Sequence, residues 1–296
     1  MQILLTGATG LIGQQVEQRL APGADILRLG RRATSDIQCD LSDAAALSRV
    51  DLPPVDALVH CAGVVDEDFR DAPERAMQMA WAGTDALVRL AVRAGAKRLV
   101  YISSAHVYGP MIGATDETRP VNPVSDYAIA HFVTEQVFSR AATAGIRVLA
   151  LRPCAVFGLL HNPSEFRRWS LIPFSFPRDA ILSGEIVIRS TGEQRRNFVG
   201  TLDIANAIES WLLEGAVGFS ARNPLGAYSA SVHEFALLCS RVAASITGRP
   251  ATVIRVEPTR PTPGDDFDYR SVHPAGTAAQ SIDDYVRHLM LTLLGA

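Results

Sequence analysis

The stretch that decides the fold lies at the start of the chain, where residues 2–13 read QILLTGATGLIG. A short apolar run predicts a β-strand, and the three glycines after it open a helix predicted to end near Leu20. Glycines at this point let the chain turn tightly and let the backbone approach a pyrophosphate, whose charge then faces the helix N-terminus. A glycine-rich turn without a ligand is the alternative. The residues predicted to contact a dinucleotide are Gly7, Thr9, Gly10, Leu11, Ile12 and Gly13.

Strand-like and helical patterns alternate over the residues that follow. Such alternation is typical of a doubly wound parallel sheet with helices on both faces, an α/β architecture of the Rossmann type. The expected strands lie at residues 24–29, 37–39, 56–60, 99–103 and 147–151, and the expected long helices lie at residues 72–94 and 127–142.

After Pro153 the pattern changes, because glycine and proline become frequent and the strand-like residues 186–189 lie between polar turns. Helical patterns return at residues 202–213 and 232–245. We expect this part to form a smaller substrate-binding lobe whose segments alternate with the end of the sheet domain. The expected dinucleotide-binding domain comprises residues 1–157 and 197–225, and the expected lobe comprises residues 158–196 and 226–296.

Composition narrows the class of protein. The 296 residues carry a formal net charge of −3, whereas a nucleic-acid binder normally shows a basic excess, so we expect no nucleic-acid partner. The four cysteines lie in apolar segments without close pairing or metal-ligand spacing, and they predict neither disulfides nor a metal site. No stretch reaches the roughly 20 apolar residues that span a bilayer, and the N-terminus has no signal-peptide pattern. The sequence therefore favours a cytoplasmic protein that is not bound to a membrane.

The end of the second expected strand bears on the choice of cofactor. NAD binders usually place an acidic residue about 20 residues after the glycines, where it holds the ribose hydroxyls. Here the chain reads Leu29-Gly30-Arg31-Arg32, and two guanidinium groups suit a 2′-phosphate through charge-assisted hydrogen bonds. We therefore expect NADP to be preferred, with NAD as the alternative cofactor. A solvated basic loop is the alternative interpretation of Arg31 and Arg32.

Polar side chains end the fifth expected strand and begin the second long helix. Ser103 and Ser104 lie at the sheet edge where the carboxyl ends of parallel strands open toward ligands. Tyr127 and His131 are four residues apart and therefore share one face of the helix, one turn apart. A serine hydroxyl and a phenol that converge beside a nicotinamide can bind a substrate oxygen and transfer its proton.

Further motifs occur in a fixed order along the chain. They are Cys39-Asp40-Leu41, His60-Cys61-Ala62-Gly63, Gly83-Thr84, SSAHVYG at residues 103–109, RPCAVFG at 152–158, and RNFV at 196–199 followed by Asp203-Ile204-Ala205. Together with the opening glycines, these motifs resemble the extended short-chain dehydrogenase/reductase family, the NAD-dependent epimerases and dehydratases that act mostly on nucleotide sugars. The resemblance covers most of the chain.

This resemblance implies roles for individual residues. The catalytic serine or threonine of the family falls on Ser104, and its general acid/base tyrosine falls on Tyr127. The other matches are Asp40 and Leu41 for the pair that contacts adenine, Ala62 for a cofactor-lining position, Pro153 and Val156 for the nicotinamide side, and Arg196 for an arginine that holds the sugar-nucleotide phosphate in many relatives.

The chain departs from the family where the proton is relayed. The family lysine is His131, the asparagine usual three residues before Gly83 is Ala80, and the asparagine usual after Arg-Pro-x is Ala155. A lysine charge ~4 Å from a phenol is worth about 4 kcal/mol at an effective dielectric of ~20, or up to about three orders of magnitude in tyrosinate population. Histidine, with an ordinary pKa of about 6.5, is shorter and mostly neutral above about pH 7. Unmodified family chemistry is therefore expected to be slow here, or to use another proton route.

His106 is a candidate for such a route. It lies two residues after Ser104, at a position that carries substrate-specific acid/base groups in several branches of the family. Dehydratases of the Thr-Asp-Glu type have two carboxylates here, whereas this chain has Ala105 and His106, which argues against that type. An imidazole can act as acid or base near about pH 7, and a passive polar role is the alternative for both His106 and His131.

The combined prediction is an NAD(P)-dependent oxidoreductase or epimerase that acts on a hydroxyl or keto group of a sugar or sugar nucleotide. Ser104 and Arg196 would bind the substrate. The predicted catalytic residues are Ser104, Tyr127, His131 and His106.

A non-catalytic sensor or partner subunit that binds dinucleotide is the alternative, and Ala80, Ala155 and His131 favour it. The expected helix is apolar on more than one face around residues 77–94, and relatives pair their two long helices in a dimer. We therefore also expect a homodimer.

Overall fold

The structure, a computed structural model, describes residues 1–214, 217–255, 263–273 and 279–295. Its contacts group the chain into two compact units, named here the sheet unit and the second unit. The sheet unit comprises Met1–Gly109, Arg119–Pro153 and Ile204–Pro224, and the second unit comprises Pro110–Thr118, Cys154–Asp203 and Leu225–Ala296.

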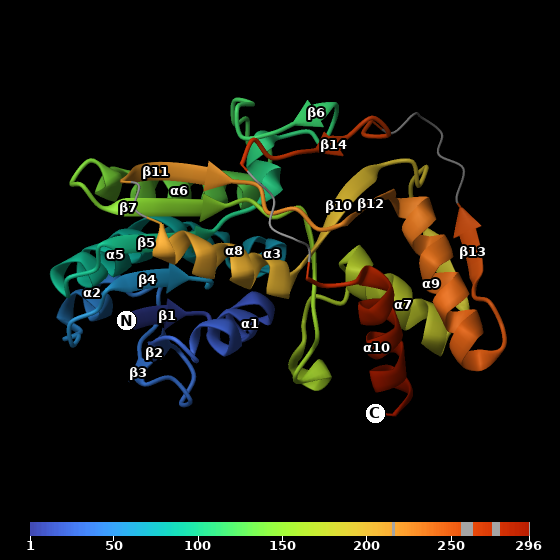
Figure 1. Ribbon diagram of the computed structural model, residues 1–296, viewed down its shortest axis with the longest axis horizontal. Coiled ribbons are helices and arrows are strands. Elements are labelled where there is room, and N and C mark those ends of the chain that lie inside the picture. Colours follow the sequence, from blue (N-terminus) through green and yellow to red (C-terminus); the bar gives the residue numbers. More distant parts are fainter. Residues whose placement is uncertain (215–216, 256–262, 274–278, 296) are drawn as a thin grey trace. The chain divides into compact units, whose positions relative to one another are not determined.

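A seven-stranded parallel sheet forms the centre of the sheet unit, which confirms the α/β fold predicted from the alternating pattern. In spatial order the strands are β11 (Gly218–Arg222), β7 (Arg147–Leu151), β5 (Arg98–Ile102), β4 (Ala57–His60), β1 (Gln2–Thr6), β2 (Asp25–Gly30) and β3 (Ile37–Gln38) (Figure 1). The strand order reverses between β1 and β4. In open parallel sheets, ligands bind beyond the carboxyl ends of the strands at such a point.

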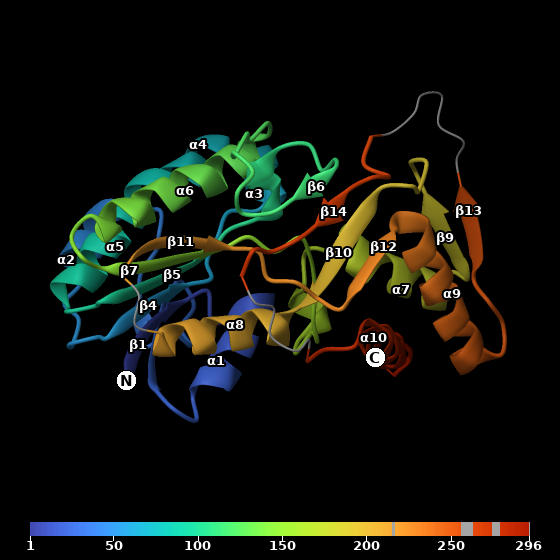
Figure 2. The same cartoon turned by 45° about the horizontal axis from the view of Figure 1, so that its top comes forward.

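Helices cover both faces of this sheet. They are α1 (Leu11–Leu20), α2 (Ala44–Arg49), α3 (Asp66–Asp71), α4 (Pro73–Gln78), α5 (Thr84–Arg93), α6 (Asp126–Ala142) and α8 (Thr201–Leu213). Figure 2 shows α4, α5 and α6 on one face and α1 and α8 on the other. The central strands β4 and β7 are buried along their whole length, as parallel strands between two helical layers should be. Leu58, Leu99 and Phe138 are fully buried in the resulting core.

The long helix expected at residues 72–94 is present from Pro73 to Arg93, but it contains a turn that the apolar spacing did not predict. It begins at Pro73, where a proline suits the first helical position, but Met79–Gly83 form a wide π-type turn between α4 and α5. The spacing of apolar residues does not predict this turn, because the turn packs closely against another segment of the chain. A Cβ at Gly83 would lie 1.8 Å from the carbonyl oxygen of Leu41. Turns of this type are frequent at functional sites.

The second unit is built from small sheets and three α-helices among its described residues, and the sequence predicted only part of them. Its core is aromatic, because Phe174, Phe198 and Phe235 are fully buried and the last two stack with ring centroids 4.5 Å apart. Residues 110–118, expected in the cofactor domain, belong here because they pair with residues late in the chain. The strands are β8 (Ala155–Phe157), β10 (Arg195–Gly200) and β12 (Tyr228–Ser231), β9 (Glu185–Ile188) and β13 (Thr252–Arg255), and β6 (Ala114–Thr115) and β14 (Asp268–Tyr269); the helices are α7 (Ile172–Leu182), α9 (Val232–Thr247) and α10 (Ile282–Leu294).

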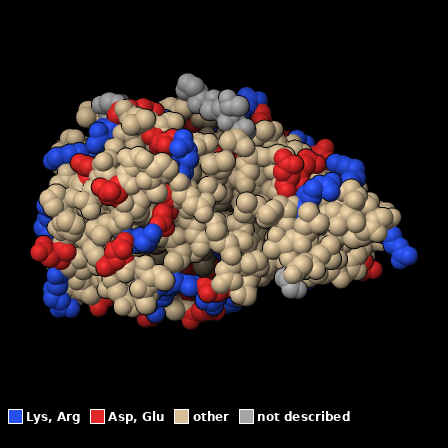
Figure 3. Space-filling model, turned by 60° about the horizontal axis from the view of Figure 1, so that its bottom comes forward, with Lys and Arg blue, Asp and Glu red and all other residues tan. Residues whose placement is uncertain are grey.

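Charged side chains of both signs are scattered over the face that Figure 3 shows. The basic and acidic residues there are interspersed, in agreement with the small net charge. Within the described ranges, no helix has the length and apolar character needed to cross a bilayer. The same residues contain no group of three or more His, Cys, Asp or Glu side chains placed to hold a metal ion. All four cysteines are unpaired.

Candidate active site

The glycine-rich turn between β1 and α1 packs too closely for side chains. Gly7 has a φ of +72°, and a Cβ there would lie 2.6 Å from the backbone nitrogen of Ala62. A Cβ at Gly13 would lie 2.0 Å from the carbonyl oxygen of Gly7. α1 follows Gly10 without a side-chain cap and without an acidic residue in its first turn, so its N–H groups suit an anion. The turn therefore fits the pyrophosphate of a dinucleotide. Of the other predicted contacts, Thr9 lies in the same turn, and Leu11 and Ile12 are the first two residues of α1.

Charged side chains surround the end of β2. Arg31 and Arg32 are exposed directly after the strand. Asp40 accepts hydrogen bonds of 2.9 and 2.8 Å from the backbone and hydroxyl of Ser42, and it pairs with Arg75. Burial by itself would raise the pKa of Asp40, but the Ser42 hydrogen bonds and the neighbouring guanidinium groups outweigh it and lower that pKa. Arg75 lies 35 residues from Asp40 in the chain, so the sequence did not predict this contact.

The four residues predicted to be catalytic lie together at the carboxyl end of β5. Ser104 is buried, and its hydroxyl accepts a 3.2 Å hydrogen bond from the backbone N–H of His106. The exposed His106 ring stands edge-on to the Tyr127 ring, with centroids 5.7 Å apart. Tyr127 lies half-buried in the first turn of α6, and its ring centroid is 4.4 Å from that of His131. A hydroxyl, a phenol and two imidazoles thus form one cluster.

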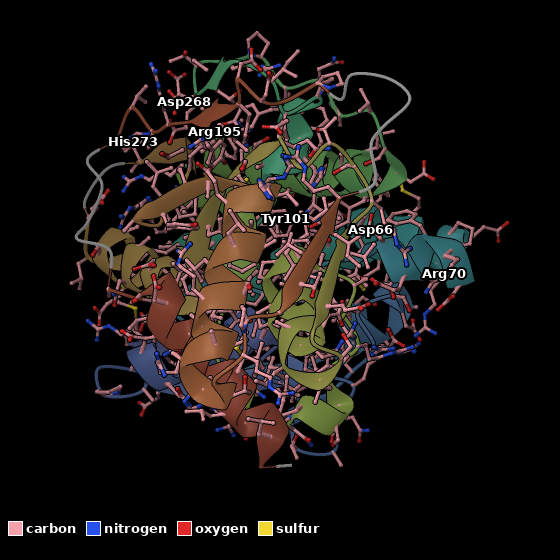
Figure 4. All side chains as sticks on the ribbon, turned by 90° about the vertical axis from the view of Figure 1, so that its right-hand side faces the viewer. Asp66, Arg70, Tyr101, Arg195, Asp268 and His273 are labelled. Carbon is pink, nitrogen blue, oxygen red and sulfur yellow. The ribbon has the colours of Figure 1, made fainter. Side chains whose placement is uncertain are left out.

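His131 is a buried member of this cluster, with only 4% of its surface exposed. Its Nδ1 lies 2.6 Å from the phenol oxygen of Tyr101. The other edge of the imidazole faces Gly63, where a Cβ would lie 3.3 Å from Cε1 and 3.9 Å from Nε2 of His131. Tyr101, labelled in Figure 4, lies in the interior. Burial holds the pKa of Tyr101 well above its ordinary value, so that this phenol stays protonated.

A second buried histidine extends the row of rings toward the glycine-rich turn. His60 ends β4 and stacks on Tyr101 with centroids 5.5 Å apart, and its Nδ1 lies 2.6 Å from the hydroxyl of Thr6. Burial lowers the pKa of His60 to about 3, so that this imidazole is neutral near neutral pH. The row continues from Tyr101 to His131 and Tyr127. No charged side chain belongs to this row unless His131 is protonated.

A buried ion pair fixes the elements that carry the cluster. Arg152 donates hydrogen bonds of 2.9 and 2.7 Å to the two carboxylate oxygens of Glu135. Glu135 also accepts a 2.5 Å hydrogen bond from Ser103, and the Arg152 guanidinium lies over the ring of Tyr108 at 4.8 Å. Burial by itself would lower the pKa of Arg152, but the bonds to Glu135 outweigh it and raise that pKa. These contacts connect α6 to the ends of β5 and β7.

The remaining predicted site residues fall in both units. Leu41 is buried and Ala62 is half-buried in the sheet unit, and Pro153 is the last residue of one of its segments. Val156 in β8 and Arg196 in β10 belong to the second unit. Burial lowers the pKa of the Arg196 guanidinium. The structure groups Leu41, Ala62 and Pro153 with the catalytic cluster in one unit.

Tyr101 and Glu135 are site residues that the sequence did not predict. Tyr101 lies in an apolar strand, where an aromatic residue usually belongs to the hydrophobic core. The sequence therefore gave no sign that its hydroxyl group has a hydrogen-bond partner. Glu135 carried a usable signal, because it lies four residues after His131 on the same helical face. A carboxylate on a buried face needs a cationic partner.

The parallel sheet, the glycine-lined turn and the Ser-Tyr cluster at the sheet edge are the features expected of an α/β protein that binds a dinucleotide. The model of the NAD dependent epimerase/dehydratase family matches residues 3–220, which is more than half of the chain. The chain belongs to this family, as the motifs predicted.

Two curated relatives illustrate the range of the family. The chain is 28% identical over 288 residues to a dTDP-4-dehydro-6-deoxy-D-allose reductase from Streptomyces bikiniensis, covering 88% of this chain and 85% of that protein. It is 28% identical over 170 residues to a UDP-glucose 4-epimerase from Vibrio cholerae, covering 53% and 52% of the two chains.

Solved structures share the fold along the whole chain. A UDP-glucose 4-epimerase from Thermotoga maritima with UDP-glucose superposes with a TM-score of 0.78 at 19% identity, covering 100% of this chain and 99% of that one. RMD from Pseudomonas aeruginosa, complexed with NADPH, also gives a TM-score of 0.78, at 21% identity and 99% coverage of both chains. At these identities the likeness bears on the fold alone.

Proposed function

We propose that this chain is an NAD(P)-dependent reductase or epimerase that acts on a hydroxyl or keto group of a sugar nucleotide. The observation that carries the proposal is the cluster of Ser104 and Tyr127 in the same unit as a turn that fits a dinucleotide. The relatives support the substrate class, because they include a dTDP-sugar reductase and a UDP-glucose epimerase.

In this proposal, side chains of the cluster handle the substrate oxygen and its proton. The Ser104 hydroxyl donates to the oxygen while it accepts from the backbone of His106. The Tyr127 phenol transfers the proton between itself and that oxygen. His106 is exposed beside Tyr127 and can exchange protons with solvent. A bound nicotinamide supplies the hydride chemistry. Arg196 would bind a phosphate of the substrate.

Residues of the sheet unit would hold the dinucleotide. Gly7, Gly10 and Gly13 would face the pyrophosphate, and Asp40 the adenine side. Exposed Arg31 and Arg32 would favour NADP(H) by binding its 2′-phosphate. Structures with this fold hold either NAD or NADPH, so the fold does not fix the preference.

The test is a turnover assay on the purified full chain. We expect the nicotinamide absorbance to change with at least one member of a panel of dTDP- and UDP-linked sugars and keto sugars, and sugar epimers to be detected chromatographically where no net redox occurs. Tyr127→Phe should reduce the rate by roughly 10²–10⁴-fold while leaving dinucleotide affinity nearly unchanged. An unchanged rate in Tyr127→Phe would contradict the proposed chemistry.

A non-catalytic dinucleotide sensor is the second candidate. The observation that favours it is that His131, at the position of the family lysine, is buried and hydrogen-bonded to Tyr101. This function predicts tight dinucleotide binding by the wild-type chain and no turnover with any sugar nucleotide of the panel.

We further propose a homodimer that uses the helical face of α5 and α6. Trp81 is 53% exposed, an unusual state for so large an apolar ring, and its face is covered by Arg140 of α6 at 5.3 Å. Val92 of α5 is also exposed. Sedimentation at micromolar concentration should show a dimer that Trp81→Glu weakens, and a wild-type monomer would contradict the proposal.

A further inference from the structure

Asp40, Ser42 and Arg75 form a closed ring of polar contacts beside the edge strand β3. Arg75, on α4, pairs with Oδ2 of Asp40 and donates a 3.2 Å hydrogen bond from Nε to the hydroxyl of Ser42. That hydroxyl donates a 2.8 Å hydrogen bond to Oδ1 of Asp40, which also accepts one of 2.9 Å from the Ser42 backbone. Each side chain of the ring therefore contacts the other two.

The ring lies at the same edge of the sheet as Arg31. β2 and β3 are parallel neighbours in which Gly30 is paired with Gln38, so the residues that follow both strands lie beyond their carboxyl ends. The side-chain amide of Gln38 donates a 2.9 Å hydrogen bond to the carbonyl oxygen of Arg31. Asp40 follows two residues later, which places a carboxylate close to an arginine proposed to bind a 2′-phosphate.

A carboxylate at this place is unfavourable for NADP(H). Burial by itself would raise the pKa of Asp40, but the hydrogen bonds from Ser42 and the charges of Arg75 and Arg31 lower it, so this carboxyl group is ionised near neutral pH. The 2′-phosphate of NADP(H) is also anionic, with a charge of about −1.5 to −2, and an uncompensated carboxylate would repel it. NAD(H) lacks this phosphate, so the same repulsion hardly affects its binding.

Arg75 supplies the compensating charge. Its guanidinium is held at the carboxylate by the bonds to both Asp40 and Ser42. The pair is partly exposed, with 53% of the Arg75 side chain and 35% of the Asp40 side chain accessible, so the effect of each charge is moderated by solvent. Asp43, the next carboxylate along the chain, caps α2 by accepting a 2.8 Å hydrogen bond from the backbone of Ala46.

We propose that Arg75 influences cofactor specificity through Asp40: by pairing with this carboxylate, it offsets a repulsion that would otherwise disfavour the 2′-phosphate of NADP(H). The inference rests on the dinucleotide binding proposed above, but it needs no direct contact between Arg75 and the cofactor. It concerns the ratio of the affinities for NADPH and NADH, so it holds whichever of the two the wild-type chain prefers.

The test is calorimetric titration of the purified full chain with NADPH and with NADH. In Arg75→Gln, we expect the ratio of the NADPH affinity to the NADH affinity to fall by roughly fivefold, because Asp40 loses its cation. Adding Asp40→Asn to this variant should return the ratio to near the wild-type value, because the repelling charge is then removed as well. A contact of Asp40 with the part that both dinucleotides share would cancel in the ratio.

Ionic strength gives a second measurement of the same effect. Salt screens the interaction between exposed charges, so the difference in ratio between the wild-type protein and Arg75→Gln should shrink from about 0.05 M to about 0.5 M salt. Arg70→Gln is the matched control and should leave the ratio unchanged. Arg70, labelled in Figure 4, is an exposed arginine of α3, the helix before α4, and it pairs with Asp71.

Two results would overturn the inference alone. One is an unchanged ratio in Arg75→Gln. The other is a lowered ratio that Asp40→Asn does not restore, which would show that Arg75 acts on the cofactor directly and not through Asp40. A wild-type chain that binds neither dinucleotide would instead overturn the proposed function, and this inference with it.

Discussion

The glycine-rich turn after β1 and the start of α6 are both parts of the candidate site, but they are built by different means. The turn works through its backbone, and the absence of side chains at Gly7 and Gly13 allows the close contacts. The start of α6 works through side chains held by partners on other elements, such as Tyr101 on β5 and Arg152 after β7. A local motif therefore specifies the first region, whereas the second depends on contacts that only the folded chain brings together.

Breaking the buried ion pair should have the largest effect on the region built from side chains. Glu135→Gln leaves Arg152 charged and incompletely paired in the interior, which should lower the free energy of unfolding by about 3–5 kcal/mol. Urea denaturation measures this change. The matched control is Glu209→Gln, which removes a partly exposed pair with Arg19 and should cost about 0–1 kcal/mol. Equal losses of unfolding free energy in the two variants would contradict a larger contribution of the buried pair to stability.

One added methyl group in the glycine-rich turn should disrupt its backbone conformation and weaken dinucleotide binding. In Gly13→Ala the new Cβ would meet the Gly7 carbonyl oxygen at 2.0 Å, so the turn must shift. Because the turn fits the pyrophosphate only in its present shape, we expect dinucleotide affinity to fall by roughly 100-fold or more, about 2.7 kcal/mol. Calorimetric titration measures it. Gly23→Ala is the control, since its Cβ would make only an ordinary contact at 4.0 Å, and a comparable loss there would refute the explanation.

Substitution of the two arginines after β2 tests whether this part of the site also discriminates between NADP(H) and NAD(H). Replacing Arg31 and Arg32 together by serine should lower the affinity for NADP(H) by roughly tenfold or more while NAD(H) binding changes little, because charge-assisted hydrogen bonds to a 2′-phosphate are lost. Arg249→Ser, which removes an exposed arginine of the second unit, should alter neither affinity. Equal affinities of the wild-type chain for both dinucleotides would contradict the proposed preference.

His60 should leave a signature in the pH dependence of stability. Burial lowers its pKa to about 3 from the ordinary 6.5, so below about pH 6.5 the unfolded chain binds a proton that the folded chain does not. The contribution is complete above about pH 6.5 and is lost by up to about 1.4 kcal/mol per pH unit as the pH falls toward 3. His60→Asn should flatten the decline in unfolding free energy between about pH 7 and 5, whereas exposed His106→Asn should not. Parallel curves for wild type and His60→Asn would exclude the burial effect.

The sequence predicted the parallel sheet and the position of the glycine turn because both follow from local patterns. Apolar strand runs and glycines with fixed spacing act within a few residues of each other. The interruption at Met79–Gly83 was not predicted, since it depends on the approach of Leu41 from another segment. Tyr127 and His131 were predicted to share a helical face, and their rings do lie side by side.

What the sequence could not show were the partners that set the chemistry of the predicted residues. Tyr101 is 30 residues from His131, and Arg152 is 17 residues from Glu135. A spacing rule within one helix does not reach partners on other strands. Much of the second unit was also unpredicted, because its short strands pair segments such as Ala114–Thr115 and Asp268–Tyr269 that lie far apart in the chain.

We propose that Tyr127 transfers the proton beside His131, a histidine that stands where the family has a lysine. The most direct measurement is the turnover rate against pH for the wild-type protein, His131→Lys and the neutral control His131→Gln, with the sugar nucleotide that gives the highest rate. We predict a low wild-type rate that rises with pH as Tyr127 ionises, and a gain of roughly tenfold for His131→Lys near about pH 7, because a cation stabilises the tyrosinate. High wild-type turnover that His131→Lys abolishes, or dinucleotide binding without turnover in all three proteins, would contradict the account.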